Sequence, residues 1–370
     1  MPKARIAIIG TGSWSTTAHF PALAAHPEAE ITAICDHREE ALKLAADAFG
    51  ITNTYTDYRE MLDQVELDGA IVAVWHVAHY EVARACLEHD LHVMLEKPMV
   101  LKATDARDLV ALAEQRDREL IIGYPYHFAP RALQAREIIR SGKLGEVQYV
   151  NCYFASSCIN QYRGNDKIVA ETVGFPVMGF GDVYSDPERS GGGQGHLQVT
   201  HSAGLMLFVT GIRPVTVMAL MNDLDVKVDV IDAITARMDN GALANIGSTG
   251  NLPVTDSGAL DLHVSCERGR LDFDFISGAG HIRHADGSDE FLEGPNTADM
   301  SPGADQPDEL YPLFATATNL VDVITGKNPN GSPAEIGWWT VELLDAAYRS
   351  AALDGQAVSV NTLYTDEPSG

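Results

Sequence analysis

The sequence predicts an α/β protein whose N-terminal part is a doubly wound parallel sheet and whose C-terminal part is a second domain. Three observations lead to this expectation. An isoleucine-rich run at residues 5–9 is followed at once by Gly10-Thr11-Gly12 and a helical pattern. Strand-like and helical segments then alternate as far as residue 122, and strands and hairpins dominate beyond residue 146. We therefore divide the 370 residues into domains at 1–125 and 126–370.

The glycine turn after the first strand has the arrangement that binds a dinucleotide. Gly10 permits the tight turn, and Gly12 lets backbone N–H groups approach a pyrophosphate without a Cβ in the way. The helix that follows presents its N-terminal N–H groups to the phosphates. We expect Ser13 and Trp14 to contact the cofactor as well, and the small Ser15 stands where a third glycine is usual. The alternative is a glycine turn inside an ordinary parallel sheet with no ligand.

Asp36 ends the second expected strand, residues 31–35, where a carboxylate can accept hydrogen bonds from the adenosine ribose hydroxyls. A carboxylate there repels a 2′-phosphate, so NAD is favoured over NADP. Arg38 weakens that preference because an arginine can accommodate the extra phosphate, and His37 lies between the two. A simple helix N-cap is the other interpretation of Asp36.

The alternation continues along the N-terminal domain. We expect helices at residues 41–49, 79–89 and 104–118, and strands at 69–74, 92–95 and 120–122. Ligands bind at the carboxyl ends of the strands in such a sheet, so the residues just past those ends are candidates for a site. They are Trp75, His76, Glu96, Lys97 and Tyr124.

Lys97 is followed by Pro98, which restricts the lysine to extended backbone. A lysine partly desolvated in a cleft has a lowered pKa and can assist the removal of a hydroxyl proton. The other interpretation is a solvated lysine at the start of a loop.

The C-terminal domain reads as strands, hairpins and two late helices. We expect strands at 147–154, 215–221, 231–238, 242–248, 260–266 and 270–275, and a hairpin at 281–292. Helices are expected at 311–325 and 333–353, returning to pack near the first domain. Residues 155–195 show little periodicity, and a loop of this length is usually functional or disordered.

Gly10, Asp36, His79 at the start of a helix, and Glu96-Lys97-Pro98 together resemble the Gfo/Idh/MocA family. The resemblance covers residues 4–360. It implies an NAD(P)-dependent enzyme acting on sugars or polyols, built from a Rossmann domain and an α/β domain with a large open mixed sheet. It also implies that a second subunit covers that sheet. We therefore expect NAD as cofactor, a small carbohydrate as substrate, and a homodimer or homotetramer.

The resemblance implies that the contacts on the nicotinamide side of the cofactor come from Trp75, His76, His79, Glu96 and Lys97. One departure lies among them, because the family's Thr-Pro-Asn is here Val74-Trp75-His76.

A second departure lies in the helix after the glycine run at residues 191–195. The family carries an Asp there and, four residues on, a catalytic His; His201 matches the His, but Leu197 stands in place of the Asp. Without the Asp, the site resembles the family branch that uses NAD to cleave glycosides, in which a Thr-His pair like Thr200-His201 begins this helix. A core histidine without chemistry is the other interpretation of His201.

This resemblance leads to the hypothesis of glycoside hydrolysis through transient oxidation at sugar C3. Lys97 and His201 handle the hydroxyl proton, and Tyr124 or His201 removes the C2 proton before the aglycone leaves, water adds and the hydride returns. A sugar or polyol dehydrogenase that accumulates NADH is the alternative. A non-catalytic NAD-binding protein is the third interpretation.

Cationic side chains precede the helix of His201 in an otherwise acidic chain. We expect an anionic sugar such as a sulfoquinovoside, contacted by Arg163, Lys167, Arg189, Gln194 and Thr200. The other interpretation is a solvated loop whose cations form ion pairs with Asp166, Asp186 and Glu188.

The bulk composition excludes several classes of function. A formal net charge of −26 argues against nucleic acid and anionic membranes as partners. No apolar run approaches the ~20 residues that span a bilayer. Five scattered cysteines without metal-type spacing favour a reducing cytoplasm and no structural metal. The first strand begins within five residues of the start, which leaves no room for a signal peptide.

Overall fold

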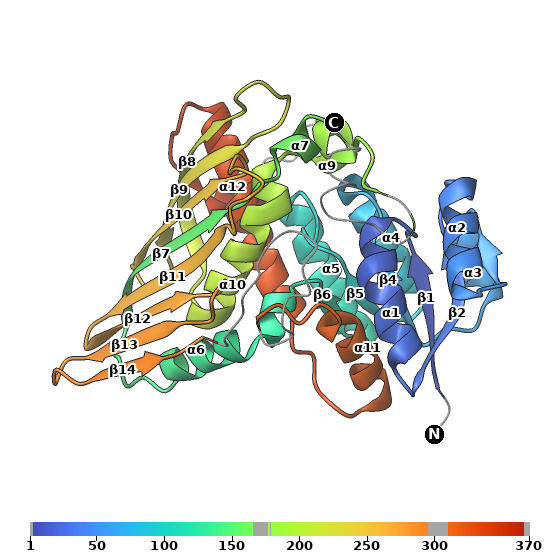
Figure 1. Cartoon of the computed structure of the whole chain (residues 1–370), viewed down its shortest axis with the longest axis horizontal. Helices are drawn as coiled ribbons and strands as arrows, with labels where there is room; N and C mark the ends of the chain where they lie inside the picture. Colours follow the sequence, from blue (N-terminus) through green and yellow to red (C-terminus); the bar gives the residue numbers. More distant parts are fainter. Residues whose placement is uncertain (1–2, 166–176, 178, 295–309, 366–370) are drawn as a thin grey trace.

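The computed structural model describes residues 3–165, 177, 179–294 and 310–365. Two sheets organise the chain, a six-stranded sheet in the N-terminal part and a nine-stranded sheet in the C-terminal part (Figure 1). Lys167 lies outside the described residues, so its expected contact with a substrate is not addressed by the structure. None of the described helices combines the length and the apolar character needed to cross a bilayer.

The first sheet is parallel throughout and has the strand order β3-β2-β1-β4-β5-β6. Its strands are β1 (Ala4–Ile9), β2 (Ala29–Cys35), β3 (Thr54–Tyr55), β4 (Gly69–Val72), β5 (His92–Leu95) and β6 (Leu120–Ile122). They are short apolar runs because helices cover both faces of the sheet. One face packs on α1 (Phe20–Ala25), α2 (Glu39–Phe49) and α11 (Ala315–Thr325). The other packs on α3 (Tyr58–Gln64), α4 (His79–Glu88) and α5 (Ala103–Arg116).

The second sheet is mixed and has the strand order β14-β13-β12-β11-β7-β10-β9-β8-β15. Its strands are β7 (Val147–Ala155), β8 (Pro214–Asn222), β9 (Ile231–Met238), β10 (Leu243–Thr249), β11 (Ala259–Cys266), β12 (Gly269–Asp274), β13 (Gly280–His284), β14 (Asp289–Leu292) and β15 (Val358–Ser359). The β7–β10 pair is parallel, and the other pairs are antiparallel.

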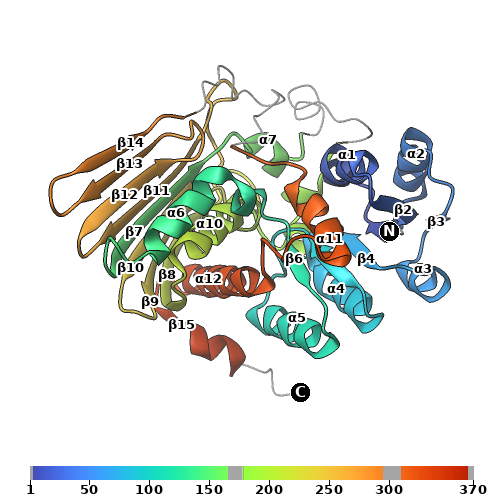
Figure 2. The ribbon, with the colours of Figure 1, turned by 90° about the horizontal axis from the view of Figure 1, so that it is seen from below.

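One face of the second sheet packs on α6 (Pro130–Arg140), α10 (Thr200–Thr210) and α12 (Ala334–Ala352). Among the described residues no helix lies over its other face (Figure 1; Figure 2). Side chains alternate between the two faces along each strand, as in β9, where exposed and buried residues alternate from Ile231 to Met238. The open mixed sheet expected from the family resemblance is therefore present.

Most expected elements appear within a residue or two of their predicted bounds, and the differences have local causes. The strand expected at 69–74 ends at Val72, because the chain then turns toward Trp75. The helix expected at 311–325 begins only at Ala315. The described parts of the segment 155–195 include the short helices α7 (Ile159–Tyr162) and α9 (Pro187–Ser190), which lack a long apolar stripe and so gave no periodic signal.

Candidate functional site

The candidate site lies where the carboxyl ends of β1, β4, β5 and β6 face the start of α10. The glycine turn after β1 has the geometry that its sequence predicts. Gly10 has φ +96°, and a Cβ on it would lie 2.3 Å from the carbonyl oxygen of Ala73. The helical segment that follows opens with a π-helical turn (Ser15–His19) and continues as α1. No side chain caps this helix, and its first turn holds no acidic residue, which suits a bound pyrophosphate.

Asp36 lies against the glycine turn and is held by several donors. Its carboxylate accepts hydrogen bonds from the backbone N–H of Thr11 at 2.9 Å and from Nη2 of Arg38 at 2.9 Å. The other oxygen accepts from the backbone N–H and Nε of Arg38. Burial would raise the pKa of the Asp36 carboxyl, but these bonds hold it below its usual value. Arg38 thus covers the carboxylate that was expected to meet the ribose.

His37 and Trp75 lie beside Asp36. Nδ1 of His37 is 3.7 Å from Oδ1 of Asp36, and the His37 ring meets the ring of Trp75 edge-on, with centroids 5.2 Å apart. Trp75 follows β4, so side chains from two neighbouring strand ends gather at one corner of the sheet.

Glu96 is the centre of a buried network that the sequence did not reveal. Its Oε1 accepts from Nε1 of Trp14 at 2.9 Å and lies 3.0 Å from Nε2 of His19, and its Oε2 accepts from the backbone N–H of Lys97. Burial would raise the pKa of this carboxyl, but His19 and Lys97 lower it. A Cβ on Gly123 would lie 2.8 Å from Oε1, so any other residue there would displace the Glu96 carboxylate from this network. The network connects the end of β5 to the helical segment that follows the glycine turn.

Lys97 projects from β5 toward the second domain. Its Nζ donates a hydrogen bond to the backbone carbonyl of Leu197 at 3.2 Å. Burial lowers the pKa of this lysine, although the Glu96 carboxylate opposes the shift. Lys97 in turn helps to lower the pKa values of His76 and His201, so the three side chains share one electrostatic environment.

His201 is buried on α10 between two aromatic rings. Its ring stands edge-on to Tyr124 and Tyr126, with centroids 6.2 and 6.0 Å away. Nδ1 of His201 is buried and has no hydrogen-bond partner among the described residues. Burial, with Lys97 and His127 as further causes, holds the pKa of His201 well below its ordinary value. The imidazole is therefore neutral at neutral pH and has a nitrogen that can accept a proton.

Tyr124 is nearly inaccessible and already hydrogen-bonded. Its hydroxyl lies 2.9 Å from Oγ1 of Thr200, and burial raises its pKa to about 12. Tyr124 therefore keeps its proton at neutral pH, and the Thr200 hydroxyl expected to meet a substrate meets Tyr124.

The histidines after β4 bind backbone carbonyls. Nδ1 of His76 lies 2.8 Å from the carbonyl oxygen of Ser190, at the end of α9. Nδ1 of His79 lies 2.8 Å from the carbonyl of Pro98, and its Nε2 lies 3.2 Å from that of Val74. His79 thus clamps the loop that carries Lys97 to the end of β4.

The Leu197 side chain is buried at the start of this helix. It packs into an apolar cluster with Cys158, Ile159, Tyr162, Val228 and Val230. The helix begins with a π-helical turn (Gly195–Val199) before α10, which changes the spacing on which the sequence comparison with the family relies. The next residue, Gln198, donates from Nε2 to Sγ of Cys158 at 3.1 Å. The positive charge of Lys97 opposes the rise that burial causes in the pKa of the Cys158 thiol.

Two of the expected substrate cations, Arg163 and Arg189, pair with carboxylates. Nη2 of Arg163 lies 3.0 Å from Oδ1 of Asp225. Arg189 bonds Asp182 and Asp186, and its guanidinium lies 5.2 Å from the centre of the Trp75 ring. Asp186 is a partner that the ion-pair interpretation of the sequence named.

Gln194 is buried and has partners on both ends of its amide. It donates to the hydroxyl of Ser248 at 2.7 Å and accepts from the hydroxyl of Tyr162 at 2.6 Å.

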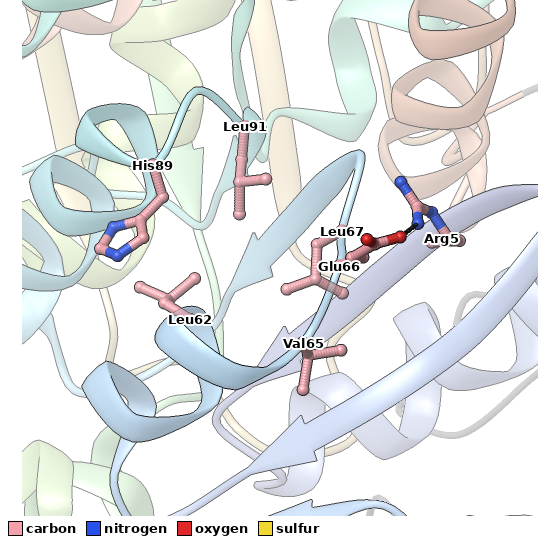
Figure 3. Close-up of a pocket in the computed structure, with 7 residues that line it drawn as sticks. All are labelled: Arg5, Leu62, Val65, Glu66, Leu67, His89 and Leu91. Carbon is pink, nitrogen blue, oxygen red and sulfur yellow. Dashed lines mark hydrogen bonds and ion pairs between the residues drawn. The ribbon is translucent and has the colours of Figure 1, made fainter.

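A surface pocket of about 250 Å³ lies at the opposite end of the first sheet (Figure 3). It is lined by residues at the amino ends of β1, β4 and β5, including Arg5, Leu67 and Leu91, and an ion pair joins Arg5 to Glu66 at 2.7 Å. A nucleotide binds at the carboxyl ends of parallel strands, so this pocket is not the cofactor site. Within the described ranges no group of three His, Cys, Asp or Glu side chains is arranged to hold a metal ion.

Two family matches place this fold among known proteins. Residues 4–124 match the Gfo/Idh/MocA oxidoreductase family with its NAD-binding Rossmann fold, and residues 132–272 match a C-terminal domain of the same family. D-glucoside 3-dehydrogenase of Escherichia coli is 29% identical over 189 residues, which are 51% of this chain and 49% of that protein. D-apiose dehydrogenase of Paraburkholderia graminis is 28% identical over 188 residues, 48% of this chain and 50% of that protein. The chain thus matches about half the length of these curated relatives.

Solved structures show the same fold over nearly the whole chain. Levoglucosan dehydrogenase, in complex with NADH and levoglucosan, superposes with a TM-score of 0.79 at 16% identity, covering 97% of this chain and 99% of that one. Aldose-aldose oxidoreductase from Caulobacter crescentus superposes with a TM-score of 0.73 at 22% identity, covering 96% and 99%. With the glycine turn, the Glu96-Lys97 strand end and both domain matches in agreement, the chain belongs to the Gfo/Idh/MocA family of oxidoreductases, and its first domain is an NAD-binding Rossmann domain.

Proposed function

We propose that this protein is an NAD-dependent dehydrogenase of a secondary hydroxyl group in a sugar or polyol. The observation that carries the proposal is that Lys97, at the carboxyl end of the NAD-binding sheet, bonds the backbone of the helical segment that carries His201 and lowers the pKa of His201. The names of the relatives, D-glucoside 3-dehydrogenase and D-apiose dehydrogenase, support it. They favour the dehydrogenase, which the sequence placed second, over the glycoside hydrolase that it placed first.

Bound NAD supplies a hydride acceptor, so the chain's own residues have to bind the alcohol and remove its hydroxyl proton. The Lys97 ammonium, which donates to the Leu197 carbonyl, is placed to donate to the reacting oxygen instead and to stabilise its developing negative charge. Nδ1 of His201 has no partner among the described residues and takes the proton. The alcohol thereby loses one proton to the protein and one hydride, and it becomes a ketone or a lactone.

Tyr124 supports this arrangement through its neutral hydroxyl. With a pKa raised to about 12 by burial, it is a poor base at neutral pH compared with the neutral His201. Its bond to Thr200 holds the first turn of α10 against the end of β6 and so orients His201.

Redox-neutral cleavage of a glycoside is the second candidate, and Leu197 is the observation that favours it. No carboxylate occupies this position, and the Leu197 side chain packs in an apolar cluster. The anionic-sugar part of that hypothesis has weaker support, since Arg163 and Arg189 are paired with carboxylates. A neutral sugar is therefore the first substrate class to test.

The test mixes purified protein and NAD with sugars, polyols and aryl glycosides, one of them with a sulfonate at C6. NADH absorbance and aglycone release are followed together. NADH accumulation with a free sugar or polyol supports the dehydrogenase, whereas aglycone release without NADH accumulation would replace it by the second candidate.

Lys97→Met should abolish turnover while leaving NAD binding intact, because the methionine fills the space of the lysine without its charge. Lys102→Met, at an exposed lysine five residues on, is the matched control and should behave as wild type. Turnover by Lys97→Met near the wild-type rate contradicts the assignment.

A further inference from the structure

The glycine run before α10 is held in place by one carboxylate, Asp229, from the loop between β8 and β9. Oδ1 of Asp229 accepts the backbone N–H of Gly193 at 2.7 Å, and Oδ2 accepts that of Gly195 at 2.6 Å. The hydroxyl of Tyr348, on α12, donates to Oδ1 at 2.8 Å. The backbone carbonyl of Asp229 also accepts the N–H of Gln194 at 2.8 Å. A single residue thus binds three consecutive backbone N–H groups at the start of the π-helical turn.

A chain of hydrogen bonds leads from this carboxylate to Lys97. The N–H of Gly193 donates to Asp229, and the carbonyl of Gly193 accepts the N–H of Leu197 at 2.9 Å. The carbonyl of Leu197 then accepts Nζ of Lys97 at 3.2 Å. Because Asp229 binds the backbone N–H groups on both sides of this turn, it fixes where the turn begins and so where the Leu197 carbonyl meets Lys97.

The packing around this chain allows little movement. A Cβ on Gly193 would lie 2.0 Å from the carbonyl oxygen of Asp229. A Cβ on Gly192 or Gly195 would lie 2.3 or 2.6 Å from the hydroxyl of Tyr348. The glycines are therefore required by the close approach of Asp229 and Tyr348, which no pattern in the sequence indicated.

A second carboxyl group, Asp232 on β9, lies against the first. It is 2% exposed, and neither of its oxygens has a donor among the described residues. Burial and the neighbouring Asp229 raise its pKa well above the usual value, so it keeps its proton. The Asp229 carboxylate accepts three hydrogen bonds, whereas the buried Asp232 beside it has no hydrogen-bond partner among the described residues.

We propose that Asp229 is a positioning residue for the reaction, which holds the glycine run so that the Leu197 carbonyl meets Lys97. The role in catalysis rests on the proposed function, whereas the effect on Lys97 does not.

Other charged and titratable groups also face these residues. Glu96, Cys158, His76 and His201 surround Lys97. Asp232, Tyr348, His196 and Tyr162 surround Asp229. Substitutions of Asp229, Asp232 or Tyr348 leave the groups around Lys97 in place.

The experiment measures the titration of Lys97 directly in the apoprotein. Pulses of acetic anhydride across a pH series label neutral amines, and mass spectrometry reads the peptide that contains Lys97. Asp229→Asn puts an amide against N–H donors and displaces the glycine run, so Lys97 loses its Leu197 acceptor, the pKa of Lys97 should fall, and labelling should begin at lower pH. Asp232→Asn leaves the bonds of Asp229 to the glycine run in place and should move the titration less.

Asp274→Asn is the matched control, because Asp274 also accepts two backbone N–H groups, from Ile276 and Ser277, and lies at the end of β12. It should lower thermal stability without moving the Lys97 titration. With an active sugar, Asp229→Asn should lower kcat about tenfold or more while KM changes by no more than about threefold, because ground-state binding is retained.

An unchanged Lys97 titration in folded Asp229→Asn overturns the proposal, and so does a shift of equal size in Asp232→Asn. If Asp229→Asn does not fold, Tyr348→Phe removes one donor from Asp229, and the same downward shift, smaller in size, is expected; its absence also overturns the proposal. A wild-type protein inactive on every sugar counts against the proposed function alone, since the titration is read without substrate.

Discussion

At the scale of single residues, the candidate site combines charged and neutral side chains close to one another. His201 is neutral because it is buried beside a lysine, and Glu96 stays ionised because His19, Trp14 and the Lys97 backbone bind it. Each side chain therefore has a protonation state suited to one task, which is how enzymes run proton transfer at neutral pH.

The pH dependence of turnover should report Lys97 and His201. His201 must be neutral to take a proton, and its pKa is lowered, so the acid limb of kcat/KM should lie well below pH 6.5. Lys97 must be charged, and its pKa is also lowered, so the alkaline limb should lie below pH 10.5. His201→Gln should lose the acid limb and about a hundredfold in kcat. His89→Gln, at an exposed histidine, is the control; an acid limb that persists in His201→Gln would show that another group is the base.

Cofactor choice should depend on the ion pair between Arg38 and Asp36. Arg38→Ala frees the Asp36 carboxylate to accept ribose hydroxyls and removes a cation that could meet a 2′-phosphate. The ratio of the NADP Kd to the NAD Kd should rise by about tenfold, as expected for the loss of a charge-assisted bond. Titration of both nucleotides by protein fluorescence measures the ratio. Arg59→Ala, at an exposed arginine of α3, is the control, and an unchanged ratio in Arg38→Ala contradicts this role.

At the scale of elements, the π-helical turn before α10 decides which side chain meets the site. An uninterrupted α-helix would put residues 197 and 201 on one face. The wider turn changes this spacing, and the Leu197 side chain packs against Val228 and Val230. The backbone carbonyl of Leu197 faces Lys97 instead.

A pair of aspartate substitutions tests this turn. Leu197→Asp buries an unpaired carboxylate in an apolar cluster and should destabilise the protein by about 2–5 kcal/mol. Gln198→Asp places the charge beside Cys158, near Lys97, and should stay folded while raising the pKa of Lys97. Thermal unfolding and the alkaline limb of kcat/KM measure the two effects. Equal stability of the two variants would mean that the turn does not separate the positions.

At the scale of the whole molecule, the site lies between two domains that the late helices join. Leu320 and Val321 of α11 pack with Ile6 and Ile8 on the first sheet. α12 contributes Ala334 and Val341 to the first domain's core and Leu343 to the second's. The C-terminal helices return to the first domain, as expected from the sequence. They thereby fix the position of Lys97 relative to α10.

The open face of the second sheet should carry the subunit interface expected from the family resemblance. Leu220 is 63% exposed and Met218 49% exposed on β8, and both point away from the helices. Light scattering after gel filtration should give a dimer or tetramer of the 40.0 kDa chain, and Leu220→Glu should lower the mass. Leu44→Glu, at an exposed leucine of α2, is the control. A monomeric wild type contradicts the expectation.

The sequence by itself determined the parallel sheet, its order of elements and the carboxyl-end candidates. The strands at 92–95, 120–122 and 231–238 were predicted at the bounds that the structure shows, because hydrophobic periodicity is a local property of the chain. The glycine turn and Lys97 could also be found, since their geometry follows from neighbouring residues.

Only the tertiary structure decided which distant groups meet. Packing brings Lys97 to the Leu197 carbonyl, pairs Arg163 with Asp225, and places Asp229 under Gly193 and Gly195. Each of these partners lies far along the chain, and a carboxylate or carbonyl has no sequence pattern that marks its partner. Burial, which sets the protonation of His201 and Asp232, likewise exists only once the two domains have packed.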